Sequence, residues 1–97
     1  MTETLDDLLN KVEAIIKCRA GTYDELHKAT KKPLSSLYDL IGGPRRFKPN
    51  GDITLKIQTW AAKKTTQIAI GLKETQSAYR AAYQEIREKR SPVGGRK

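Results

Sequence analysis

Residues 22–41 constrain the fold most strongly, because they predict two short helices separated by a tight turn. Thr22 followed by Glu25 matches a capping box, in which each side chain accepts a backbone N–H at the start of a helix. Pro33 suits the first turn of the next helix, where its missing N–H has no partner to lose. The apolar residues of that helix recur at helical spacing: Leu34, Leu37, Tyr38 and Ile41. Gly-Gly-Pro at 42–44 then ends the helix.

The charge of the chain is unevenly distributed. The 97 residues are enough for one compact domain, and their formal net charge is +8. Residues 1–30 carry a net charge of −2, whereas residues 31–97 carry +10. A basic region that begins at the turn of the helix pair favours a polyanionic partner such as nucleic acid. The alternative explanation is an ordinary solvated surface.

Three further segments complete the expected fold. Apolar residues at i, i+3, i+4 and i+7 predict an amphipathic helix over residues 4–19. Residues 45–57 predict a β-hairpin, because Asn50-Gly51 suits a type I′ turn and every second residue after it is apolar. A helix around residues 53–64 is the competing interpretation. Residues 58–90 predict a largely helical segment with a break or kink at Gly71.

Residues 25–41 resemble the helix-turn-helix of winged-helix transcriptional regulators, whose pattern is roughly E-L-A-x-x-T-G-L-P-x-S-T-h-x-x-h-h, with h apolar. The matching positions are Glu25, Leu26, Thr30, Pro33, Ser35, Ser36, Leu37, Leu40 and Ile41. The chain departs from the pattern at His27, Lys31 and Lys32, where Ala, Gly and an apolar residue are usual. A non-glycine residue at the glycine position predicts a strained or differently shaped turn.

This resemblance covers about residues 5–57 and implies a mainly α fold with a small β-hairpin. The expected organisation is a winged helix-turn-helix domain at 1–57, a long C-terminal helix at 58–90 and a disordered basic tail at 91–97. An all-α, Cro-repressor-like helix-turn-helix fits the same helix pair, with residues 49–63 forming a loop and a fourth helix.

A helix-turn-helix places the start of its second helix in the DNA major groove, and the neighbouring cations contact phosphates. The expected DNA-binding residues are Lys28, Lys31, Lys32, Ser35, Ser36, Tyr38, Arg45, Arg46, Lys48 and Asn50. The second helix contains no Arg, Asn or Gln, which make bidentate contacts with bases. This composition argues against strong direct readout by that helix alone.

The apolar stripe of the C-terminal segment predicts homodimerisation, because a head of this size leaves part of the stripe uncovered. The expected dimerisation residues are Ile68, Leu72, Tyr79, Tyr83 and Ile86.

The sequence therefore predicts a sequence-specific double-stranded DNA-binding protein, a dimeric transcriptional regulator that acts by occupying an operator. We expect it in the cytoplasm, associated with the nucleoid, in a bacterium, phage or plasmid system. One alternative is an architectural or partition-type protein that coats DNA, and another is an antitoxin or adaptor-type protein-interaction module.

We expect no enzyme activity, cofactor, metal or small-molecule substrate. Cys18 and His27, the only cysteine and histidine, are expected to pack on short helices, and no phosphate-binding loop follows Gly42-Gly43. No apolar run reaches the length of a membrane span.

Overall fold

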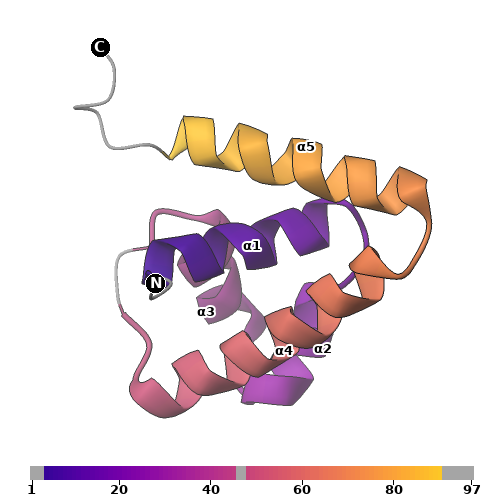
Figure 1. The fold of residues 1–97 in the computed structure, drawn as a ribbon. Helices are drawn as coiled ribbons and strands as arrows, with labels where there is room; N and C mark the ends of the chain where they lie inside the picture. Colours follow the sequence, from indigo (N-terminus) through magenta and orange to yellow (C-terminus); the bar gives the residue numbers. More distant parts are fainter. Residues whose placement is uncertain (1–3, 46–47, 91–97) are drawn as a thin grey trace.

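Helix α1 (Leu5–Lys17) lies at the centre of this computed structural model, which describes residues 4–45 and 48–90. The Thr4 hydroxyl accepts the backbone N–H of Asp7 at 3.1 Å, and this cap begins the helix where the sequence predicts. The helix buries its apolar face, which comprises Leu8, Leu9, Val12 and Ile15. Figure 1 shows α1 between α5 on one side and α4 on the other, with α2 packed against α4.

The predicted helix pair is confirmed as α2 (Tyr23–Thr30) and α3 (Leu34–Leu37), which continues into a π-helical turn, η1 (Tyr38–Gly42). The Thr22 hydroxyl accepts the Glu25 N–H at 3.2 Å, as the capping pattern predicts. The Glu25 carboxylate does not complete the capping box, because it forms an ion pair with Lys64 Nζ of α4 at 2.9 Å. α2 is therefore tied to α4 by an ion pair as well as by packing.

Helix α4 (Gly51–Ala69) occupies the segment in which the sequence predicts a hairpin, so the predicted wing is wrong. The Asn50 side chain accepts the Ile53 N–H at 2.8 Å and caps the helix instead of forming a hairpin turn. Ile53 and Ile57 are buried, whereas Leu55 is 59% exposed. The alternation of Ile53, Leu55 and Ile57 therefore does not reflect a strand. The buried residues of α4 follow a helical period instead, which continues through Trp60, Ala61 and Ile68.

The described residues form an all-α fold without strands, which matches the all-α alternative rather than the winged one. Residues 58–90 do not form one helix, because α4 ends at Ala69 and α5 (Lys73–Lys89) begins after a short corner at Gly71. The domain boundary expected after residue 57 falls inside α4. The predicted tail at 91–97 lies outside the described residues.

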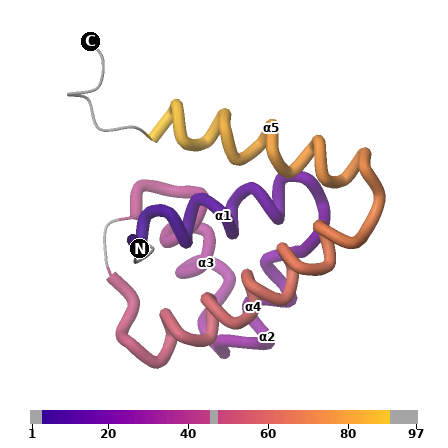
Figure 2. Tube along the Cα trace, in the orientation of Figure 1, coloured from indigo at the N-terminus to yellow at the C-terminus, as the bar shows by residue number. Residues whose placement is uncertain are grey.

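Helix α5 folds back and runs antiparallel to α1, as the tube in Figure 2 makes clear. Lys17 Nζ donates to Glu85 Oε1 at 3.1 Å, and this bond holds the pKa of the Glu85 carboxyl below its usual value. Just past the C-terminal end of α5, Arg90 Nε donates to Glu13 Oε1 at 3.0 Å. Ile86 is 2% exposed and packs with Ala14 of α1. α5 therefore belongs to the core of its own chain.

Candidate nucleic-acid interface

The turn between α2 and α3 consists of three residues, Lys31 to Pro33, and is held by side chains. Lys31 has φ 62° and ψ 19°, the left-handed conformation that a glycine usually supplies at this position. The Thr30 hydroxyl donates to the Leu26 carbonyl at 2.8 Å and accepts the Lys32 N–H at 3.2 Å. These bonds lock the turn although its sequence departs from the usual pattern.

His27 stands where a small residue is usual, and it also supports the turn. Its Nδ1 lies 2.6 Å from the Lys32 carbonyl oxygen. A carbonyl only accepts hydrogen bonds, so this contact requires the proton on Nδ1. The imidazole therefore fastens the end of α2 to the turn, and the departure from the pattern has a structural function.

The second helix buries one face and exposes another. Leu37, Leu40 and Ile41 are at most 2% exposed and anchor it in the core. Leu34 is 36% exposed and Tyr38 51% exposed, one helical turn apart on the outer face. Of the predicted serines, Ser35 is exposed and Ser36 is half-buried. The exposed face is therefore small, uncharged in its first turn, and partly apolar.

Tyr38 is held in place by a neighbouring ring. The rings of Tyr38 and Tyr23 meet edge to face, with their centroids 4.4 Å apart. Burial, followed by the nearby Glu13 carboxylate, raises the pKa of the Tyr23 phenol. Both tyrosines and Leu34 line a groove of about 500 Å³ between the start of α2 and α3. Arg19, which is exposed, stands at the same groove.

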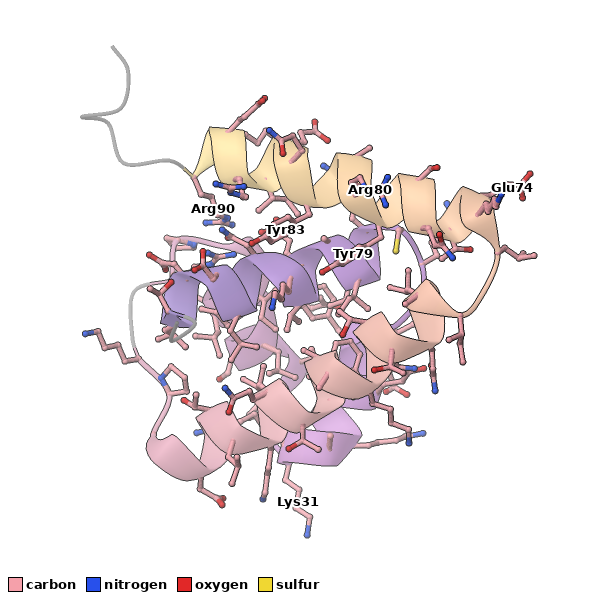
Figure 3. The ribbon with its side chains drawn as sticks, viewed as in Figure 1. Lys31, Glu74, Tyr79, Arg80, Tyr83 and Arg90 are labelled. Carbon is pink, nitrogen blue, oxygen red and sulfur yellow. The ribbon has the colours of Figure 1, made fainter. Side chains whose placement is uncertain are left out.

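Three of the predicted phosphate-contacting lysines, Lys28, Lys31 and Lys32, lie on α2 or on the turn that precedes α3, and a fourth, Lys48, precedes α4. Lys28 is exposed and forms a 3.5 Å ion pair with Asp24 on the same helix. Lys31 and Lys48 are exposed, Lys32 is half-buried, and none of these three forms an ion pair with another described residue. Figure 3 shows Lys31 projecting from the body of the protein into solvent. The turn thus presents positive charge beside the exposed face of α3.

Arg45, one of the predicted DNA contacts, has a side chain that is only 9% exposed. Its guanidinium donates to Asn10 Oδ1 at 2.8 Å, to Glu13 Oε1 at 3.1 Å and to the Ile41 carbonyl at 3.0 and 3.1 Å. Burial, and then the neighbouring Arg90, lowers the pKa of Arg45. Its donors therefore have partners within the chain, and we assign Arg45 a structural role.

Two other predicted DNA contacts, Arg46 and Asn50, follow Arg45 in the sequence. Arg46 lies outside the described residues. Asn50 is exposed, but its carbonyl oxygen caps α4, so its most direct function is structural. Residues 48–57 form no hairpin, so no wing carries Asn50 to DNA.

The predicted dimerisation residues separate into three groups. Ile68 and Ile86 are buried within one chain, at 5% and 2% exposed. Tyr79 and Tyr83 are half-buried and stack with centroids 6.2 Å apart, facing the gap between α5 and α1 in Figure 3. Leu72 is 69% exposed at the α4–α5 corner. The fold thus buries two of the five residues, half-buries two and exposes one, and dimerisation stays a prediction.

Leu34 shares the helical spacing of the buried Leu37 and Ile41, although it lies on the exposed face. Its spacing fits the buried stripe, so periodicity gave no signal. Asn10 and Glu13 were not predicted as site residues. They are polar residues inside an amphipathic helix, and this was the available sign of a buried partner such as Arg45.

The described residues contain no group of three or more acidic, His or Cys side chains that could hold a metal ion. Within the same residues, no helix is long and apolar enough to cross a membrane.

No protein-family model, curated protein or solved structure matches the chain.

Proposed function

We propose that this protein binds double-stranded DNA through α2 and α3 and regulates transcription as a dimer that occupies an operator. One observation carries the proposal. The left-handed turn at Lys31 joins two short helices so that the second exposes Leu34, Ser35 and Tyr38 beside unpaired lysines. A helix presented in this way, with cations at its approach, has the form and charge required for a major groove.

The proposed binding mode divides the contacts by chemistry. Lys31, Lys32 and Lys48 contact phosphates and supply affinity without sequence information. Ser35 and Tyr38 face base edges, where their hydroxyls donate or accept hydrogen bonds. A dimer reads two half-sites and excludes other proteins from the DNA by occupying it. Cytoplasmic DNA of a bacterium or phage is the proposed setting.

A salt titration tests this function. Fluorescence polarisation with a labelled duplex measures the dissociation constant at several salt concentrations. Each phosphate contact contributes about 0.9 to the slope of log affinity against log salt. Replacing Lys31 or Lys48 with methionine should therefore lower the slope by about 1 per protomer.

The matched control is Lys73→Met, which removes an exposed lysine of α5 that forms no ion pair with a described residue. It should leave the slope nearly unchanged. Affinity without salt dependence, or equal effects of the Lys31 and Lys73 variants, would refute the assignment of DNA binding to α2 and α3.

A second candidate function is a protein that coats DNA, and the composition of α3 favours it. No Arg, Asn or Gln lies between residues 34 and 42, so bidentate base recognition is absent from this element. Footprinting separates the two candidates. A short protected palindrome supports the regulator, and protection that spreads with protein concentration supports the coat.

A third candidate is an adaptor that binds another protein, and the α4–α5 corner favours it. Ile70 and Leu72 are 81% and 69% exposed there. Beside the corner, Ile68, Ala69 and Tyr79 line a groove of about 290 Å³. A stoichiometric protein that co-purifies with the wild-type chain and is lost from Leu72→Ser supports this function.

A further inference from the structure

Leu34 is an apolar side chain in a position where the fold does not require one. It is 36% exposed, and the residues that anchor the same helix in the core are Leu37, Leu40 and Ile41. Tyr38 follows Leu34 by four residues, so the two side chains share the outer face of the helix. Together they form an apolar patch on the surface that the proposed function places against DNA.

The groups around this patch restrict what it can recognise. The helical turn Leu34–Leu37 contains no acidic or basic residue. Ser35, beside Leu34, is exposed and offers one hydroxyl. In the major groove, the apolar group on a base edge is the C5-methyl of thymine, and apolar side chains contact it. The patch therefore matches a thymine edge better than a guanine or cytosine edge.

We propose that Leu34, with Tyr38 behind it, recognises the C5-methyl group of thymine, and this inference rests on the proposed DNA-binding function. Contact with Tyr23 restricts the Tyr38 ring, so little side-chain freedom is lost on binding. Lys31 and Lys32, which form no ion pair with any residue of 4–45 or 48–90, flank the patch on its N-terminal side. These cations match phosphates rather than an apolar protein surface. The specificity of α3 thus comes from burial of methyl groups instead of bidentate hydrogen bonds.

Replacing thymine with uracil tests the inference, because it removes only the methyl group. Two duplexes of identical A·T-rich sequence, one with thymine and one with uracil, are titrated with the full chain by fluorescence polarisation. A second pair contains G·C-rich sequence with cytosine or 5-methylcytosine, which adds a methyl in the major groove. Burial of one methyl corresponds to about a fourfold change in affinity. We expect binding at least about fourfold weaker to the uracil duplex, and tighter binding to the methylated G·C duplex.

Leu34→Ala should abolish the difference between thymine and uracil while retaining salt-dependent binding to both duplexes. The matched control is Leu55→Ala, which shortens an exposed leucine of α4 and should preserve the difference. Equal affinity of the wild-type chain for thymine and uracil duplexes would overturn methyl recognition and leave the DNA-binding function intact. Absence of binding to all four duplexes would overturn both.

Discussion

Replacing Arg45 with methionine separates a structural role for this residue from the DNA contact that the sequence predicts. The change removes the guanidinium but keeps a long apolar side chain, so little space is left empty. Arg45 links two elements, since its partners are Asn10 and Glu13 of α1 and the Ile41 carbonyl of η1. The variant therefore removes these polar links between α1 and the end of the second helix, while Arg90 still donates to Glu13 and to the Ile41 carbonyl.

The expected loss of stability follows from these contacts. Removal of one member of a buried ion pair costs about 3–5 kcal/mol, because the other charge is left without compensation. Glu13 would still form its ion pair with Arg90 at 3.0 Å, and its side chain is 23% exposed. The free-energy cost should therefore lie at the lower end of this range. Asn10, which is 7% exposed, loses the partner of its side-chain oxygen. We expect about 3 kcal/mol, which for a domain of this size lowers Tm by about 12–24 °C.

Urea unfolding followed by the fluorescence of Trp60 measures this cost. The control is Lys28→Met, which breaks an exposed ion pair and should cost less than about 0.5 kcal/mol. At a temperature where both proteins are folded, Arg45→Met should bind duplex DNA with the salt slope of the wild type. Unchanged stability together with a lower salt slope would refute the structural assignment and restore Arg45 as a phosphate contact.

Three further variants test the left-handed turn at Lys31, the close packing at Gly21 and the titration of the Tyr23 phenol. Lys31→Gly should stabilise the fold by about 1 kcal/mol, because glycine adopts the left-handed turn without strain, and should weaken DNA binding. Gly21→Ala should destabilise it by about 1–3 kcal/mol, because the added Cβ would lie 2.6 Å from Trp60 Cζ2. The raised pKa of Tyr23 means that its contribution to stability is complete below pH 10 and declines as the pH rises through the folded-state pKa. Urea midpoints at neutral and strongly alkaline pH should therefore differ less in Tyr23→Phe.

Each of these variants has a comparison that isolates its cause. Lys31→Ala removes the same charge but keeps a Cβ in the left-handed backbone conformation. Equal stability of the Ala and Gly variants would therefore contradict the argument from backbone strain. Gly51→Ala adds a Cβ that meets no atom within 4 Å, and it should not destabilise the protein. An alkaline loss of stability that is the same in Tyr23→Phe and the wild type would assign the loss to other groups.

The helix starts and the buried stripe were predictable from sequence because they depend on local chemistry. Thr4 and Thr22 cap the helices that follow them, as their spacing to an acidic residue indicates. The hairpin was not predictable in this way, since Asn50 suits a turn and a helix cap equally well. Packing of α4 against α1 and α2 decided between the two, and that information lies in residues distant along the chain.

The candidate site shows the same division between local and distant information. Lysines at the turn remained on the surface, whereas Arg45 turned inward because Asn10 and Glu13, more than 30 residues earlier, provide its partners. A charge count treats all these residues as equal contributors to a basic surface. Attraction for phosphates comes from the charged side chains that have no partner within the chain. Around α3 these are a few lysines. A short basic rim around an apolar patch supplies modest phosphate attraction, so specificity of the proposed regulator must depend on the base edges that Leu34 and Tyr38 can reach.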